Sequence, residues 1–417
     1  MTSPLAATAR WLDDRLSLAE VGRKTLRKPF PGHWTFLIGE IAVYSLIVLF
    51  ATGTFLALFY KPSTRAVVYQ GPYAPLQGHE VSAAFDSVMR LTFEVRAGLL
   101  MRQIHHWAAL LFMASIVVHM FRAFFTGAFR RPRELMWITG LVLLVLAIGA
   151  GFTGYSLPDD VLSGTGLRIG YSALVSVPFI GPWLAFTGLG GEFPNPDVIA
   201  RLHIFHVMLL PALLAVVVTA HLAILFRQRH TQHRGRGRTE RNVVGKPLYR
   251  TQTLVSLSLF AFTVAVLGLL GGLFEINPVW VYGPWELSVV FAPSQPDWYV
   301  GWLEGLLRLW PAWEWTIFGV TIPQPFIPGV VLPGVIFTTA GAWPWIEARF
   351  ITKDAGEHNL LDRGRDVPLR TAIGVGAMAF LLVVFVAGSN DVLAARLGLA
   401  LGRSRNCSRG ARWSCHR

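Results

Sequence analysis

Residues 102–122 read RQIHHWAALLFMASIVVHMFR, and this stretch decides how the chain is built. It is apolar and long enough to cross a membrane as one helix, which takes roughly 20 residues at 1.5 Å rise. It nevertheless carries His105, His106 and His119, and ionisable side chains at membrane depth are costly and usually functional. His105 and His119 are fourteen residues apart, about 21 Å of rise and 40° short of four turns, so both lie on one helix face.

A second apolar stretch, residues 201–221 (RLHIFHVMLLPALLAVVVTAH), repeats this arrangement. His206 and His221 are fifteen residues apart, about 22.5 Å of rise and 60° beyond four turns. We therefore expect His105 to face His206 near the outer surface, and His119 to face His221 near the inner one. A pair of imidazoles without carboxylate or thiolate suits the iron of a six-coordinate haem, which transfers electrons rather than binding oxygen.

The competing interpretation is that these histidines are packed side chains, as single buried histidines usually are. Two pairs with matched spacing favour haem ligation. His106 and His203 have no partner at the same depth, and we expect them to be structural.

Four glycines and two arginines support the haem interpretation. Gly39 and Gly53 are fourteen residues apart in one predicted helix, as are Gly140 and Gly154 in another, and small residues let a flat macrocycle approach the backbone. Helix packing through small residues is the alternative. The arginines lie three residues outside a ligand on each side, where haem propionates need a cation, although snorkelling anchors would look the same. These arginines are Arg102 and Arg122.

Composition places the whole chain in a membrane. Hydrophobic residues make up 53% of the 417 residues, charged residues only 15%, and mean hydropathy is +0.48. A soluble chain carries about a quarter charged residues. The two cysteines, Cys407 and Cys415, both lie in the last eleven residues, which excludes a disulfide scaffold, an iron–sulfur cluster and a structural zinc site.

The sequence predicts an all-α membrane protein with seven transmembrane helices, four of which form a dihaem bundle. The predicted spans are about 35–59, 104–124, 137–156, 204–226, 253–274, 327–346 and 372–390. No short cleavable signal is expected. Basic residues concentrate in alternate connections, with six Lys/Arg before the first span and eight between the fourth and fifth. The positive-inside rule then predicts a multi-pass plasma-membrane protein with a cytoplasmic N-terminus. These basic runs are expected to be solvated anchors, and binding of anionic lipid is the alternative.

Several motifs together resemble cytochrome b of the respiratory quinol–cytochrome c oxidoreductase, the cytochrome bc complex. They are RQIHHW ending at Trp107, HMFR at 119–122, GYSLP at 154–158, RLHIFH at 201–206 and QPDWY at 295–299. The resemblance covers roughly residues 30–392. The fifteen-residue spacing resembles the plastid and Gram-positive branches, and PDWY with HTQ at 230–232 resembles the actinobacterial branch, which typically uses menaquinol.

This resemblance implies a translocase with two b-type haems and two quinone sites. Quinol oxidation at the outer site sends one electron to a Rieske iron–sulfur subunit and the other across the haems to quinone at the inner site. It also implies a cytochrome c subunit, a homodimeric complex in membrane lipid, and a terminal oxidase as a further partner in a supercomplex. Nucleic acid is not an expected partner.

The resemblance places the outer quinol site on the long connection before the sixth span. Its residues are Pro296, Asp297, Trp298 and Tyr299, and Tyr155 is a candidate wall of the same pocket. A carboxylate beside an apolar pocket can accept a proton released by quinol. We therefore expect Asp297 to act as the proton acceptor.

Two departures from the family pattern affect the inner site and the C-terminus. The stretches FRQRH (226–230) and PLYRTQT (247–253) lack the expected Asp, which leaves His230, Arg227 and Arg250 as inner quinone-site candidates. The family's eighth span is also missing, because the apolar stretch at 392–402 is too short to cross.

Four regions are expected along the chain. They are a cytoplasmic basic segment (1–34), the dihaem four-helix bundle (35–227), a quinol-site half (228–392) and a polar, disordered tail (393–417). A dihaem membrane anchor of a dehydrogenase or hydrogenase would explain the histidines but not PDWY or the last three spans. A transporter without redox function would explain only the spans.

Overall fold

The computed structural model describes residues 4–17, 19–20, 22, 26–289, 295–354 and 356–398. Within them, seven helical segments are long and apolar enough to cross a membrane, which confirms the predicted spans. They are η1 (Trp34–Phe36) with α3 (Leu37–Ala57), α5 (Gly98–Thr126), α6 (Glu134–Tyr155), α9 (Val198–Ile204) with η3 (Phe205–Leu209) and α10 (Leu210–Gln228), α11 (Thr253–Leu273), η5 (Ile327–Val331) with α14 (Leu332–Ile346) and η6 (Glu347–Ile351), and α15 (Pro368–Gly388).

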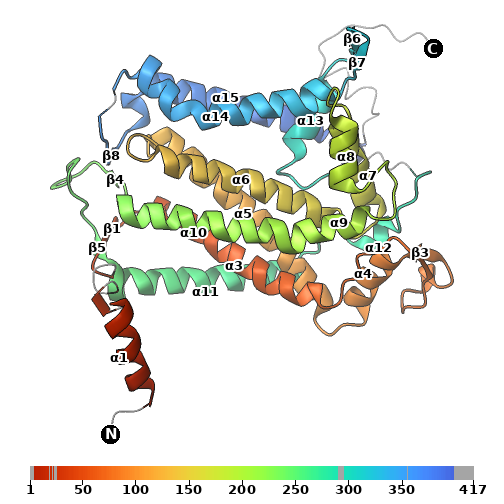
Figure 1. The fold of residues 1–417 in the computed structure, drawn as a ribbon, viewed down its shortest axis with the longest axis horizontal. Helices are drawn as coiled ribbons and strands as arrows, with labels where there is room; N and C mark the ends of the chain where they lie inside the picture. The colour runs from red at the N-terminus through yellow and green to blue at the C-terminus, as the bar shows by residue number, and fades with distance from the viewer. Residues whose placement is uncertain are drawn as a thin grey trace.

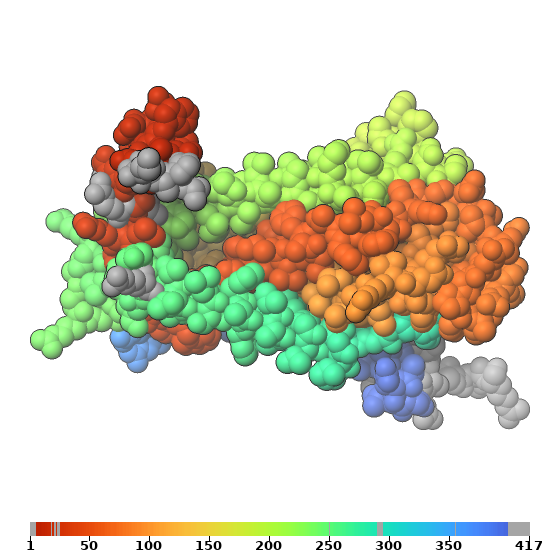
Figure 2. Space-filling model, turned by 90° about the horizontal axis from the view of Figure 1, so that it is seen from below, coloured from red at the N-terminus to blue at the C-terminus, as the bar shows by residue number. Residues whose placement is uncertain are grey.

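These segments lie side by side along the long axis of the molecule (Figure 1). Helices α3, α5, α6 and α10 form the central bundle, in which α3 packs along α5 and α6 packs along α10. Helix α11 lies against α3 and α5, while α14 contacts α6 and α15 contacts α5. Seen from below, α11 runs beside α3, with α10 on the far side of α3 (Figure 2).

Helix α11 shows why these segments suit lipid rather than water. Leu257, Phe262, Leu269 and Leu273 expose most of their side chains, whereas Thr263 and Leu267 are buried. A helix that is apolar around its circumference and still presents large side chains outward belongs in a membrane. The bundle is therefore apolar inside and outside, and its sparse polar groups stand out as candidates for function.

The connections collect at two opposite ends of the bundle (Figure 1). We call the end with the N-terminal helix α1 (Pro4–Leu16) the inner end, after the predicted topology. There β1 (Pro29–Phe30) pairs antiparallel with β5 (Lys246–Pro247), next to η4 (Leu248–Gln252), and β4 (Gln232–His233) pairs parallel with β8 (Leu360–Leu361), ahead of η7 (Gly364–Asp366).

The opposite, outer end holds most of the remaining elements. They are β2 (Ala66–Val68) paired with β3 (Glu80–Ser82), β6 (Trp315–Ile317) paired with β7 (Val320–Ile322), η2 (Ala74–Leu76), α4 (Ala83–Phe93), α7 (Val161–Val175), α8 (Gly181–Leu189), α12 (Val279–Tyr282) and α13 (Gly301–Leu309). Helix α13 follows the PDWY motif and packs closely along α15. The long connection before the sixth span is therefore a folded part of the outer end.

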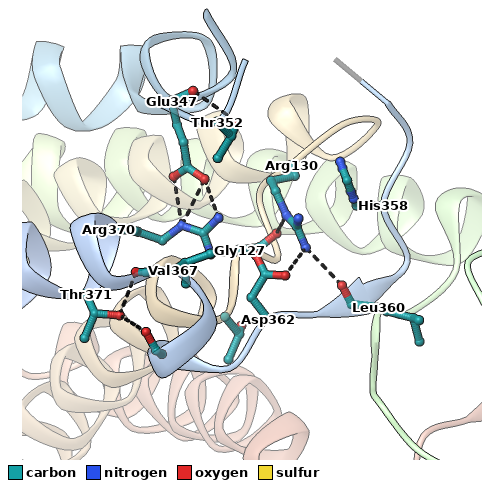
Figure 3. A network of polar contacts seen from close by, with 12 residues as sticks. Gly127, Arg130, Glu347, Thr352, His358, Leu360, Asp362, Val367, Arg370 and Thr371 are labelled. Atoms are coloured by element: carbon teal, nitrogen blue, oxygen red, sulfur yellow. Dashed lines mark hydrogen bonds and ion pairs between the residues drawn. The ribbon is translucent and has the colours of Figure 1, made fainter. Parts of the chain in front are cut away.

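Buried ion pairs fasten the last two spans to the bundle at the inner end (Figure 3). Arg370 of α15 donates from Nε to both carboxylate oxygens of Glu347 at 3.0 and 2.9 Å, and from Nη1 to Asp362 Oδ2 at 2.9 Å. Arg130, after α5, pairs with the other Asp362 oxygen at 3.1 Å. Removing one partner of such a buried pair typically costs about 3–5 kcal/mol, because the other charge is left uncompensated.

One predicted boundary is wrong. The tail was expected to be disordered from residue 393, but α16 (Asn390–Leu397) continues as a helix after α15. Asp391 in its first turn is buried and accepts hydrogen bonds from Gln295 and Arg308, which gives this short helix a tertiary anchor. The rest of the predicted tail, including both cysteines, lies outside the described residues.

Candidate functional site

The first ligand pair meets inside the bundle near its outer end. His105 of α5 and His206 of η3 have ring centroids 6.2 Å apart, with ring planes at 78°. Both line an apolar cavity of about 300 Å³ that also contacts α3 and α6. Bonds from a metal to imidazole nitrogen are about 2 Å long, so the separation has room for one metal between the two rings.

The second pair lies toward the inner end of the same helices. His119 of α5 and His221 of α10 are close enough for their charges to interact. Between the two levels lies an apolar layer that includes Phe112, Ile116 and Leu214. The structure thus brings the four predicted ligands together as two pairs at two depths.

Each of the four glycines lies against one ligand ring. A Cβ added at Gly39 would lie 3.2 Å from Cε1 of His119, and one at Gly53 would lie 3.2 Å from Cε1 of His105. A Cβ at Gly140 would lie 3.7 Å from Cε1 of His221, while one at Gly154 would collide with the ring of His206. The glycines therefore make room for the imidazole as well as for the macrocycle that the sequence suggested.

A threonine precedes the glycine at three of the four positions and orients the ligand. Thr52 Oγ1 lies 2.9 Å from His105 Nδ1, Thr139 Oγ1 lies 2.8 Å from His221 Nδ1, and Thr153 Oγ1 lies 3.4 Å from His206 Nδ1. Each threonine hydroxyl donates its proton to a backbone carbonyl one turn earlier, at 2.7, 3.0 and 2.9 Å in the same order.

The hydroxyl oxygen can then only accept from Nδ1–H, which leaves Nε2 free to bind a metal. His206 Nδ1 also lies 2.9 Å from the carbonyl oxygen of Ala150, an acceptor with no proton to give. A Thr-Gly dipeptide facing three of the four ligands was visible in the sequence and was missed.

Two buried arginines have guanidinium nitrogen atoms without a hydrogen-bond partner among the described residues. Nε and Nη2 of Arg102, and the same atoms of Arg122, are buried and have no hydrogen-bond partner among the described residues. Their other contacts are weak or apolar: Arg102 Nη1 lies 3.4 Å from the carbonyl oxygen of Asn277, and Arg122 lies over the ring of Phe36 at 4.2 Å. Buried guanidinium groups are normally paired, so the predicted propionate contacts fit these positions. The imidazole pairs, the glycines and these arginines together fit two b-type haems.

The predicted proton acceptor lies in the same outer cavity as the first ligand pair. Asp297, Tyr299 and Tyr155 all line it. Tyr299 donates from its hydroxyl to Asp297 Oδ2 at 3.1 Å, and His106 Nε2 lies 2.8 Å from Asp297 Oδ1. Burial, followed by the charge of Asp297, raises the pKa of Tyr299 well above its usual value, so this phenol stays protonated and keeps donating.

Two polar groups of this cavity were not predicted. His106 was expected to be structural, yet its Nε2 lies 2.8 Å from Oδ1 of Asp297, which follows 191 residues later in the sequence. Asp160 also lines the cavity and caps α7, accepting from the backbone N–H of Ser163 at 2.8 Å. Burial raises the pKa of Asp160 to about 6. The Asp-x-x-Ser spacing could have identified this cap in the sequence.

The other predicted outer residues face elsewhere. Trp298 is 37% exposed, and neither it nor Pro296 lines the cavity. Gln295, just before the motif, donates to Asp391 Oδ1 at 2.6 Å. That bond fixes one end of the motif, so Asp297 and Tyr299 point inward while Trp298 points away.

The inner-site candidates are less well gathered. His230 packs against Phe30 and Phe36, with ring centroids 4.6 and 6.1 Å away. Burial, followed by the charges of Arg122 and Arg133, lowers the pKa of His230 to about 4. Arg227 is exposed in the last turn of α10, and the side chain of Arg250 lies outside the described residues.

Comparisons with known proteins agree with this geometry. Residues 110–284 match the family model described as cytochrome b(N-terminal)/b6/petB. The cytochrome bc1 complex cytochrome b subunit of Mycobacterium tuberculosis is 49% identical over 398 residues, 95% of this chain and 72% of that protein. The same subunit of Corynebacterium efficiens is 46% identical over 401 residues (96% and 74%), and that of Streptomyces coelicolor is 44% identical over 394 residues (94% and 72%).

A solved structure described as a hyperthermophilic respiratory Complex III shares the fold. It superposes with a TM-score of 0.70 at 22% identity, over 96% of this chain and all of that one. Nearly half of the aligned positions are identical between these relatives and this chain, and the alignments cover almost the whole of this chain. The chain therefore belongs to the cytochrome b subunits of cytochrome bc1 complexes, the catalytic core of quinol–cytochrome c reductase, and to a family that binds b-type haem.

Proposed function

We propose that this chain oxidises quinol in the outer cavity and reduces quinone near the inner end. The observation that carries the proposal is the outer cavity, where the His105–His206 pair and the hydrogen-bonded group of His106, Asp297 and Tyr299 line one apolar space. Electron acceptor and proton acceptor lie within reach of one substrate. A dihaem anchor would need only the first of these.

Asp297 is assigned the proton-accepting role. Quinol loses two protons as its electrons leave, and an apolar cavity offers little water to take them. Tyr299 remains protonated and donates to Asp297, and His106 contacts the second carboxylate oxygen, so the acceptor is held in place by two partners. Tyr155, whose hydroxyl lies 2.9 Å from the carbonyl oxygen of Leu162, forms a further wall.

Two b-type haems, when bound, supply one-electron transfer between the two ends of the bundle. The outer haem is assigned to His105 and His206, and the inner one to His119 and His221. Arg102 and Arg122 would hold their propionates, because they bring otherwise unpaired buried guanidinium nitrogens to the two levels. The glycines admit the ligand rings close to α3 and α6.

The remaining assignments follow the relatives and the charge pattern. The partners are a Rieske iron–sulfur subunit and a cytochrome c subunit, in a homodimeric complex that associates with a terminal oxidase, and the quinol is menaquinol. The basic connections lie at the inner end, so we assign that end and the N-terminus to the cytoplasm. Protons leaving the outer cavity would then add to the transmembrane gradient.

The inner quinone is assigned to the surroundings of His230, with Arg227 and Arg250 as further candidates. His230 borders a hollow lined by Lys28, Phe30 and Phe226, which combines apolar walls with positive charge. Because its pKa lies far below neutrality, His230 would hydrogen-bond a quinone as the neutral imidazole.

Two measurements on the purified complex test the proposal. A dithionite-reduced minus oxidised spectrum should show b-type absorbance, and menaquinol should reduce cytochrome c. A complex without any b-type band would refute haem binding. A complex with both haems that reduces no cytochrome c from any quinol would refute the assigned reaction while leaving the cofactor assignment intact.

A further inference from the structure

Three of the four ligand histidines share one supporting arrangement, and His119 lacks it. Nδ1 of His119 is buried and has no hydrogen-bond partner among the described residues. It faces α3, because a Cβ added at Gly39 would lie 3.3 Å from this atom. The residue before Gly39 is Ile38, where the other three glycines follow a threonine.

The start of α3 explains why the backbone does not compensate. One of the other three ligands also has backbone support, since the carbonyl oxygen of Ala150, four residues before Gly154, lies 2.9 Å from His206 Nδ1. The corresponding residue for His119 is Thr35. It belongs to the 3-10 turn before α3, and no hydrogen bond joins it to His119 Nδ1 among the described residues. His119 therefore receives neither the hydroxyl nor the carbonyl.

A hydrogen bond from Nδ1–H changes how strongly an imidazole donates electrons to the metal bound at Nε2. A ligand whose Nδ1–H donates to an oxygen is oriented and made more basic, which stabilises the oxidised metal. A ligand without that bond favours the reduced metal by comparison. The four ligands share one further feature, because each lies against a glycine of the neighbouring helix.

We propose that residue 38 is a positioning residue for His119, and that isoleucine there raises the reduction potential of the haem held by His119 and His221. This inference rests on the proposed function, since it needs both haems in place. The outer pair carries a threonine at each ligand, at Thr52 and Thr153. The resulting difference favours electron movement from the outer pair toward the inner one.

The direct test is a redox titration of Ile38→Thr against Ile38→Val in the purified complex. The threonine variant restores the hydroxyl, and the valine variant keeps the β-branched shape without it. In Ile38→Thr we expect the ratio of reduced to oxidised inner haem at a fixed potential to fall about threefold to tenfold. That change equals a midpoint lower by roughly 30–60 mV at 59 mV per decade. The ferric electron paramagnetic resonance signal of the inner haem should change in parallel, while the outer haem and Ile38→Val stay at wild-type values.

Two variants that replace threonine by the isosteric valine test the same effect by removing a hydroxyl group instead of adding one. Thr139→Val removes the hydroxyl from His221 and should raise the inner midpoint alone, whereas Thr52→Val should raise the outer midpoint alone. These variants decide the case if Ile38→Thr fails to incorporate haem. Two haems with unshifted midpoints in Ile38→Thr, or in both valine variants, would overturn the inference. Absence of b-type absorbance in the wild type would overturn the proposed function instead.

Discussion

Asp297 at the outer end and Glu347 at the inner end are held in different ways. At the outer end, Asp297 contacts His106 and Tyr299, which are not permanent charges. At the inner end, Glu347 and Asp362 are bound by arginine, and both Glu347 and its partner Arg370 are only 1% exposed. Asp297 therefore differs from Glu347 in having no arginine partner among the described residues.

His106 and His230 also differ in their surroundings. His106 contacts the carboxylate of Asp297, whereas burial, followed by the charges of Arg122 and Arg133, lowers the pKa of His230 to about 4. The comparison teaches that residues of one type can differ in the charge of their partners, and the absence of an arginine partner among the described residues is what suits Asp297 to the proposed role of proton acceptor. The expected outcomes below test this contrast.

The largest effect should come from removing a haem ligand at either level. His119→Ala or His221→Ala should eliminate the inner haem and leave the outer one partly bound, and His105→Ala or His206→Ala should do the reverse. The physical reason is the depth matching set by helical rise. Haem counting and redox titration of each variant measure it. If His105→Ala and His119→Ala removed the same haem, the pairing would be wrong.

His106→Ala and His203→Ala are the matched controls for the ligand variants. Both residues lie beside ligands on the same helices, and both line the outer cavity. Because neither pairs with a second imidazole, both haems should remain in these variants. Loss of the outer haem in His106→Ala would shift the ligand assignment by one residue.

Substitutions at the glycines should have the next largest effect on haem incorporation, and this effect should differ between the outer and the inner haem. Gly154→Leu and Gly53→Leu place a bulky side chain at a ligand ring and should prevent incorporation of the outer haem. Even Gly154→Ala should lower its occupancy, because the added Cβ meets the ring of His206. Gly140→Ala should be tolerated, since its Cβ would lie at an ordinary 3.7 Å from His221. Haem content per polypeptide measures all four, and equal loss in Gly140→Ala and Gly154→Ala would contradict the structural difference.

Asp297→Asn should leave both haems bound and still slow quinol oxidation strongly. The amide keeps the shape of the carboxylate but cannot take the proton, and such general-base help is typically worth about 10²–10⁴-fold. Reduction of the haems backward through the inner end should survive, which would confine the defect to the outer cavity.

Asp297→Glu is the matched variant, because it restores a carboxylate one methylene longer and should retain substantial turnover. Steady-state turnover of both variants across pH gives the comparison. Wild-type rates in Asp297→Asn at every pH would reject Asp297 as the acceptor.

Helical spacing predicted the ligand pairs, whereas contacts between connections could not be predicted. The spans and the depths of His105, His119, His206 and His221 follow from the regular rise of rigid helices. The contact of His106 with Asp297 depends instead on how a long connection folds back over the bundle end, which no local pattern encodes.

Two missed features were present as local signals. The Thr-Gly dipeptides and the Asp160 cap are short patterns, but their meaning depends on which helix faces them. The helix α16 was missed for a different reason: its buried Asp391 is held by Arg308, a tertiary contact that composition does not reveal.

The smallest expected effect is a pH dependence of stability that comes from His230 at the inner end. Its pKa in the folded chain, about 4, lies below the usual value of about 6.5. The neutral ring therefore contributes stability that is fully present above about pH 6.5 and is lost as the pH falls toward 4. Because the ring is partly exposed, we expect a loss on the order of 1–2 kcal/mol. The apparent unfolding temperature of the complex in detergent, recorded at one scan rate between pH 7.5 and 4.5, measures it.

His230→Phe is the control, because a phenyl ring can replace the imidazole between Phe30 and Phe36 without titrating. The variant should lose less stability than the wild type over the same pH range, and the two should run parallel above pH 6.5. A second variant, Arg122→Gln, removes a positive charge that adds to the effect of burial, so the pKa of folded His230 should rise and the loss of stability should be smaller and end at a higher pH. If His230→Phe and the wild type fell together on acidification, His230 would not be the titrating group. The inner end would then owe its pH response to another group such as His233, whose pKa burial also lowers to about 4.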